Sequence, residues 1–83
     1  LLGLMRSWAS NLGKYNIRLN AAVPGGMYNG QAKDFVKKNS ALNMLGRMAK
    51  KDEYNGIIQF LLSDASSYMT GASLIIDGGR TAW

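Results

Sequence analysis

With 83 residues, a formal net charge of +5 and neither cysteine nor histidine, the sequence is limited in both size and chemistry. Such a length allows one domain at most, and the missing residue types exclude disulfides, thiolate metal sites and a histidine base, so we expect no metal site. The positive excess suits an anionic cofactor or nucleic acid, but no basic run is long or interleaved with aromatic residues, so we expect no nucleic-acid partner.

The apolar stretches are too short to cross a bilayer, so we expect no membrane partner. The first ten residues, LLGLMRSWAS, place no charged residue ahead of their apolar stretch, which is untypical of a signal peptide. The absence of cysteine fits a reducing compartment. Together these features lead us to expect a cytoplasmic protein.

The chain opens with a helical pattern over residues 1–12. Leu1, Met5, Trp8 and Leu12 recur at helical spacing, which predicts an amphipathic helix that ends near Gly13. The pattern starts with an apolar residue and has no capping residue before it. We therefore expect this segment to be the tail of a helix that begins earlier.

Residues 17–23 predict a strand, because their apolar residues alternate with Arg18 and Asn20. These two polar residues could support the strand or bind a ligand, and the supporting role is favoured. Pro24 cannot donate to a sheet, so the strand should stop there. Gly25 and Gly26 then free the backbone, which either turns or comes close to something flat or charged.

Two more helices and a second strand follow. Residues 31–39 predict a modest helix, and residues 40–51 an irregular connection. Residues 52–62 predict a helix with Asp52 as N-cap, Glu53 at the positive end of the dipole, and apolar residues at helical spacing. The continuously apolar residues 73–77 are typical of a strand that is buried on both faces.

Two strands joined through helices should be parallel and connected by a right-handed crossover. The sequence therefore predicts an α/β fold, a βαβ unit with one helix in front. No internal repeat interrupts this order.

The acidic residues offer no clear catalytic pair. Asp52 and Glu53 are better explained as helix-start residues. Asp77 follows a strand at the end where α/β proteins place ligands, but it also precedes Gly78-Gly79, so a turn-forming role is at least as good an interpretation. The segment TGASLIID lacks the spaced glycines of a dinucleotide-binding fingerprint.

Three sequence blocks, "IRLN…PGG", "SDASSYMTG" and the terminal "DGG", occur in an order that closely resembles the C-terminal portion of the short-chain dehydrogenases/reductases. The resemblance covers residues 1–83. It implies the C-terminal part of a Rossmann-type doubly wound parallel sheet, here two parallel strands plus helices. The family's catalytic Tyr and Lys and its Gly-rich cofactor loop would lie before Leu1. The chain alone is therefore expected to be inactive.

The resemblance also assigns candidate binding residues. In the family, the segment after Pro-Gly passes beside the nicotinamide ring and binds its carboxamide through backbone groups. By position these residues are Pro24, Gly25, Gly26 and Met27. Asn29 stands where the family often has a threonine that contacts the cofactor.

The following segment resembles the family's substrate-binding loop, with Tyr28, Gln31 and Phe35 as its candidate residues. The resemblance implies an NAD- or NADP-dependent oxidoreductase that transfers hydride between the nicotinamide cofactor and a carbonyl or alcohol substrate. Its expected partners are a small-molecule substrate and further copies of itself, as a dimer or tetramer. The alternative is a non-catalytic self-association module derived from the same fold.

Overall fold

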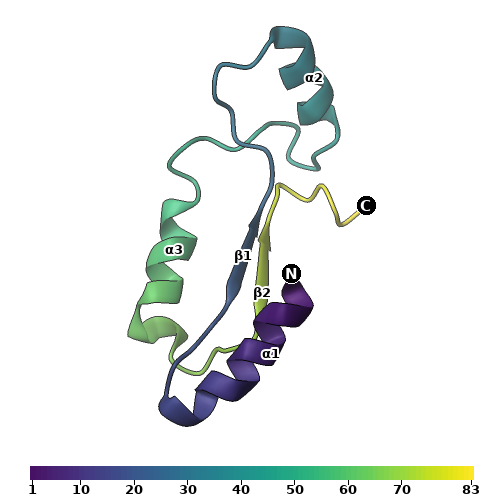
Figure 1. The fold of residues 1–83 in the computed structure, drawn as a ribbon. Coiled ribbons are helices and arrows are strands. Elements are labelled where there is room, and N and C mark those ends of the chain that lie inside the picture. Colours follow the sequence, from purple (N-terminus) through teal and green to yellow (C-terminus); the bar gives the residue numbers. More distant parts are fainter. The chain divides into compact units, whose positions relative to one another are not determined.

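The computed structural model describes all 83 residues, Leu1–Trp83. They form two compact units: Leu1–Ala22 with Gly56–Leu74, and Val23–Asn55 with Ile75–Trp83. None of the helices has the length and apolar character that a membrane span requires. Figure 1 shows the main elements, which in chain order are helix α1 (Leu2–Leu12), strand β1 (Ala21–Pro24), helix α2 (Lys33–Ala41), helix α3 (Asn55–Leu62) and strand β2 (Ser73–Ile76).

Helix α1 of the first unit lies where the sequence predicts it. It gives way at Gly13 to a short 3₁₀ helix, which Asn16 closes in the left-handed conformation with φ 59°. The buried positions are Met5 and Ala9, which are one turn apart. Trp8, expected on the apolar stripe, is 54% exposed, so the buried face is narrower than the sequence indicates.

Strand β1 begins later than the predicted residue 17. Before Ala21, the chain bonds mainly through side chains to residues 63–72 instead of through a regular ladder. The Leu19 N–H donates to Thr70 Oγ1 over 3.1 Å, and the Asn20 amide donates to the Met69 carbonyl and accepts from the Ala72 N–H. These contacts give Asn20 the supporting role that the sequence favours.

Arg18 has a supporting role too. Its guanidinium donates to Ser66 O over 2.6 Å and to Ser66 Oγ over 2.9 Å, and reaches the carbonyls of Ser63 and Met69 over 3.3 Å each. Ser66 is only 1% exposed, so this guanidinium satisfies acceptors that water does not reach. Tyr68, in the same turn, is fully exposed and takes no part in these contacts.

The two strands are adjacent and parallel, as predicted. The Ala21 N–H donates to the Ala72 carbonyl and the Gly25 N–H to the Ile76 carbonyl, each over 2.9 Å. In both pairs the acceptor lies 51 residues after the donor (72 − 21 and 76 − 25), and a constant offset is the mark of a parallel register. The expected burial of β2 on both faces is wrong, because Ile75 is 60% exposed.

Helix α3 begins at Asn55 instead of near Asp52. Residues 50–54 form turns, in which the Glu53 N–H donates to the Lys50 carbonyl and the Asn55 N–H to the Asp52 carbonyl. The helix ends at Leu62 as expected, and Ser63 then caps a short 3₁₀ helix through Ala65 N. Ile58, Leu61 and Leu62 line a groove with Leu19 and Ala22. In the first unit, α1 and α3 lie on opposite sides of the starting ends of the strands, as in a doubly wound fold (Figure 1).

In the second unit, helix α2 lies two residues later than predicted. The connection after it is irregular, as expected, and contains the unit's buried side chains, Asn43 and Met48. The C-terminal turn reaches this connection, because Trp83 Nε1 donates to the Leu42 carbonyl over 2.7 Å.

Candidate functional site

The segment that follows β1 is the first candidate region, and its first glycine is required by packing within the protein. A Cβ built on Gly25 would lie 2.8 Å from Asp77 Cα and 2.9 Å from Asp77 Cβ, closer than carbon atoms can approach. Both residues belong to the second unit. The sequence left two interpretations of this glycine open, a turn or the approach of a ligand. The close contact between the two strand ends is a further reason for a glycine at this position.

The next residues form a short parallel bridge between Met27 and Ala49. Gly26 O accepts from Ala49 N over 3.0 Å, and Tyr28 N donates to Ala49 O over 2.8 Å. Met27 itself turns its peptide groups away from this bridge: its carbonyl accepts from the Gln31 side chain, and its N–H donates no hydrogen bond. Met27 is 39% exposed. The loop therefore contains a backbone donor, the Met27 N–H, that has no partner in the chain and belongs to a partly exposed residue.

Gln31 holds this loop in shape. Its Oε1 accepts from the Asn29 N–H over 2.7 Å and its Nε2 donates to the Met27 carbonyl over 3.0 Å. The Gln31 amide is thus engaged within the loop. The other two candidate substrate-loop residues, Tyr28 and Phe35, are half exposed, and Phe35 lies on α2. Asn29 is exposed and its side chain has no hydrogen-bond partner in the chain.

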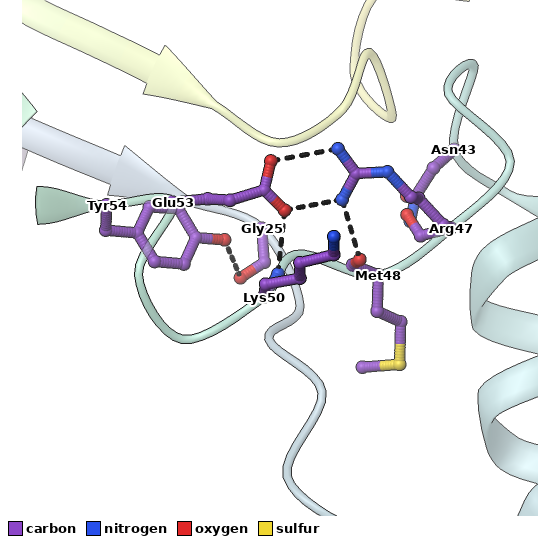
Figure 2. Close-up of polar contacts among 7 residues, drawn as sticks. All are labelled: Gly25, Asn43, Arg47, Met48, Lys50, Glu53 and Tyr54. Atoms are coloured by element: carbon purple, nitrogen blue, oxygen red, sulfur yellow. Dashed lines mark hydrogen bonds and ion pairs between the residues drawn. The ribbon is translucent and has the colours of Figure 1, made fainter. Parts of the chain in front are cut away.

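An ion pair that the sequence did not indicate joins Arg47 and Glu53, on either side of the Ala49 that pairs with Met27 (Figure 2). Arg47 donates to both oxygens of Glu53, over 2.5 and 2.9 Å, and the Lys50 N–H donates to the same carboxylate over 2.8 Å. The hydrogen bond from Arg47 is the main cause that lowers the pKa of Glu53 to about 2. Tyr54 completes the cluster by donating through its hydroxyl to the Gly25 carbonyl over 3.1 Å.

Sequence patterns missed this cluster because its members obey no period. Glu53 was interpreted as a helix-dipole residue, and Tyr54 falls within the helix predicted over residues 52–62. An arginine and a glutamate six positions apart on an irregular segment give no signal of contact. Only the folded path of residues 47–54 brings them together.

Asp77 acts as a turn residue, the simpler of its two interpretations. Its carboxylate accepts from Gly79 N over 2.9 Å, Thr81 N over 3.2 Å and Thr81 Oγ1 over 2.7 Å. The Thr81 hydroxyl is the main cause that lowers the pKa of Asp77. Gly78 and Gly79 follow with φ of 66° and 87°, which side-chain-bearing residues rarely adopt.

The chemistry available near the loop is therefore binding, not proton transfer. Glu53 and Asp77 are both held as carboxylates by hydrogen bonds that lower their pKa values, so neither suits a general base at neutral pH. What the loop offers is a backbone N–H at Met27 and the exposed amide side chain of Asn29. Such neutral donors suit an uncharged polar group such as a carboxamide.

Comparison with known proteins identifies relatives over nearly the whole chain. A family model described as enoyl-(acyl carrier protein) reductase matches residues 1–81. The chain is 45% identical over 80 residues to trans-4-hydroxycyclohexanecarboxylate dehydrogenase of Sinomonas cyclohexanicum, covering 96% of this chain and 30% of that protein. It is 40% identical over 91 residues to the NADH-dependent L-xylulose reductase of Ambrosiozyma monospora, covering 100% of this chain and 34% of that protein.

Solved structures also resemble the chain. A short-chain dehydrogenase from Leptospira borgpetersenii with bound NAD⁺ superposes with a TM-score of 0.91 at 36% identity, over 96% of this chain and 32% of that one. A short-chain type dehydrogenase/reductase from Mycobacterium marinum gives 0.89 at 34% identity, over 99% and 34%. The chain thus spans about a third of the length of these relatives. It belongs to the short-chain dehydrogenase/reductase family.

Proposed function

We propose that residues 1–83 are the C-terminal part of the single NAD(P)-binding Rossmann domain of a short-chain oxidoreductase. The complete enzyme would transfer hydride between a nicotinamide cofactor and a carbonyl or alcohol substrate. Support comes from the family match over residues 1–81 and from relatives that are named dehydrogenases and reductases. One similar structure carries NAD⁺. The catalytic Tyr and Lys and the Gly-rich loop are proposed to lie before Leu1.

The observation that carries the cofactor assignment is the free N–H of Met27. The Gly26 carbonyl and the Tyr28 N–H are used on Ala49, and Gln31 engages the Met27 carbonyl, so the Met27 N–H is a donor without a partner in the chain, on a residue that is 39% exposed. These residues fit a nicotinamide carboxamide. Pro24, Gly25 and Gly26 would set the path of the chain, and Met27 and Asn29 would contact the cofactor. When bound, the nicotinamide supplies or accepts the hydride.

The substrate would lie against the segment from Tyr28 to α2. Tyr28 and Phe35 are the exposed aromatic residues of this segment, each 51% exposed, and aromatic faces of this kind suit a cyclic or carbon-rich substrate. Gln31 would take part indirectly, since both ends of its amide are used inside the loop. The relatives act on a hydroxycyclohexane acid and on a ketose, so both are substrate classes to test.

We also propose that the protein forms a homo-oligomer through α1 and β2. Leu4 and Trp8 of α1 are about half exposed, and Ile75 of β2 is 60% exposed. Tryptophan is enriched at contacts between subunits, and contiguous exposed apolar side chains mark interaction surfaces.

The proposal is tested with the complete protein that contains this chain. Purified protein is mixed with NADH or NADPH and a panel of cyclic ketones, ketoses and acyl thioester ketones, and consumption of the reduced cofactor is followed by absorbance. We expect turnover with one cofactor and one substrate class. The 83-residue chain, as a control, should show none. Failure of the complete protein to bind either cofactor in calorimetry would refute the proposal.

A further inference from the structure

One turn of the chain, residues 47–54, holds two successive carbonyl groups of the loop after β1. The Tyr54 hydroxyl donates to Gly25 O over 3.1 Å, and Ala49 N donates to Gly26 O over 3.0 Å. All of these residues belong to the second unit. Figure 2 shows the Tyr54 hydroxyl directed at the Gly25 carbonyl. Only this first bond comes from a side chain, so a substitution can remove it and leave the backbone as it is.

The two bonds also set the directions of the N–H groups of the same peptides. The chain has no cis peptide bond, and in a trans peptide the carbonyl and the N–H point in opposite directions. The Gly26 N–H therefore points away from the Tyr54 hydroxyl, and the Met27 N–H points away from Ala49. Neither N–H donates a hydrogen bond within the chain. The turn thus decides where two unpartnered donors are directed.

The peptide between Gly25 and Gly26 depends on such a bond more than an ordinary peptide does. Neither of its residues carries a Cβ atom. Gly26 does not have a positive φ, and a half-turn of this peptide would carry it toward one, which glycine adopts about as readily as a negative φ. The conformational preferences of glycine therefore do not choose between the two orientations, and the bond from Tyr54 favours the one observed.

The turn that carries the hydroxyl is itself held in one shape. Arg47 pairs with both carboxylate oxygens of Glu53, the residue before Tyr54. The Lys50 N–H donates to the same carboxylate over 2.8 Å, and Met48 is only 6% exposed. The ion pair, the backbone bond and the buried side chain together keep the hydroxyl beside the loop.

We propose that Tyr54 is a positioning residue for the nicotinamide cofactor. By holding the Gly25 carbonyl, it keeps the loop on the path that leads to Met27, whose N–H contacts the carboxamide under the proposed function, on which this inference rests. Tyr54 need not touch the cofactor itself, since its hydroxyl hydrogen is used on Gly25. Loss of the hydroxyl should therefore weaken the contact with the nicotinamide and leave binding of the rest of the cofactor unchanged.

Tyr54→Phe in the complete protein tests this role, because phenylalanine keeps the ring and lacks only the hydroxyl. Calorimetry compares NADH or NADPH with ADP-ribose or its 2′-phosphate, which lack the nicotinamide. We expect the variant to bind the nicotinamide cofactor about three- to tenfold more weakly, which is the effect of losing one neutral hydrogen bond. It should bind the nicotinamide-free compound like the wild type. In steady-state kinetics, the cofactor KM should rise with a smaller change in kcat.

The outcomes separate this inference from the proposed function. If the wild type binds neither cofactor, the proposed function fails and the inference fails with it. If the wild type binds and Tyr54→Phe binds equally well, only the role of Tyr54 is refuted. Equal weakening of both compounds would mean that the hydroxyl acts on folding in general, which also refutes the role.

Two control variants belong to the same experiment. Tyr68 is fully exposed, so Tyr68→Phe should keep both affinities of the wild type. Arg18 makes its contacts within the first unit, so Arg18→Lys should lower stability without changing the ratio of the two affinities.

Hydrogen–deuterium exchange without cofactor gives a readout that does not depend on binding. The Tyr28 N–H donates to the Ala49 carbonyl over 2.8 Å, so its exchange reports how firmly the loop is held. In Tyr54→Phe this amide should exchange several-fold faster than in the wild type. The Leu45 amide, which donates to Gly78 O in the same unit, should keep its rate. An unchanged rate at Tyr28 would show that the hydroxyl does not hold the loop and would overturn the proposal.

Discussion

Replacing Gly25 by alanine tests whether packing between the strand ends, and not ligand binding alone, requires a glycine there. The added Cβ would lie 2.8 Å from Asp77 Cα and 3.2 Å from the Asp77 carbonyl oxygen. These are backbone atoms, so the clash cannot be relieved by rotating a side chain. The ends of the strands must move apart, and this strains the 2.9 Å hydrogen bond from Gly25 N to Ile76 O.

The expected size of the effect follows from three contributions. Overpacking of a well-packed site costs about 1–3 kcal/mol, and weakening one backbone hydrogen bond costs about 1 kcal/mol. Gly25 does not have a positive φ, so alanine can adopt its backbone conformation and restrict the unfolded chain, which returns about 0.4–1 kcal/mol. We therefore expect Gly25→Ala to lower the free energy of unfolding by roughly 1–4 kcal/mol.

The assay is urea unfolding of the complete protein followed by circular dichroism, without cofactor. Gly56→Ala is the matched control, because nothing lies within 4 Å of a Cβ at Gly56 and the residue is in α3. That variant should be more stable than the wild type by about 0.5–1 kcal/mol. The packing argument is refuted if Gly25→Ala unfolds at the wild-type midpoint and only weakens cofactor binding.

Three further predictions concern single side chains. Arg18→Lys should lower the free energy of unfolding by about 1–2 kcal/mol in urea titrations, because an ammonium group cannot make all the hydrogen bonds that the guanidinium makes to Ser66 and Met69. Arg6→Lys is the control: Arg6 is exposed, so the free energy of unfolding should not change. The pKa of Glu53 falls from its usual 4.5 to about 2 on folding, so its contribution to stability is full above pH 4.5 and is lost as the pH falls towards 2. Acid unfolding of Glu53→Gln should lack that part of the pH dependence, and added salt should shrink the difference between the variant and wild type. In steady-state kinetics, Gln31→Glu should raise the cofactor KM several-fold with a smaller change in kcat, because it removes the side-chain donor to the Met27 carbonyl. Gln59 is exposed on α3, so Gln59→Glu should leave both constants unchanged.

Elements with strong apolar patterns could be predicted from the sequence. Helix α1 and strand β2 lie within one or two residues of their expected bounds, and the parallel pairing follows from a strand, helix, strand order. Burial was less predictable. Trp8 and Ile75 fit the apolar pattern yet are exposed, since a pattern tells which residues share a face but not whether another segment covers it.

Element starts were the least predictable feature, because distant side chains decide them. Arg18 and Asn20 bind groups about fifty positions further along the chain, and this delays β1 to Ala21. Glu53 turns to Arg47 instead of to the end of the helix, and α3 starts only at Asn55. In each case a polar side chain that suits a local role is used for a tertiary contact that no local pattern contains.

The three sequence blocks that carry the family resemblance form two physical contacts, one in each unit. In the first unit, the residues of NIRLN hold the SDASSYMTG segment through Arg18 and Asn20. In the second unit, Gly25 of the Pro-Gly-Gly block lies so close to Asp77 of the DGG block that a Cβ atom on Gly25 would clash with the Asp77 backbone. Each block therefore constrains its partner, and a change in one should be tolerated only with a compensating change in the other. This mutual constraint would apply even without a ligand. Motif glycines beside a proposed cofactor loop are thus weak support for cofactor contact, and the unpaired N–H of Met27 is the stronger sign.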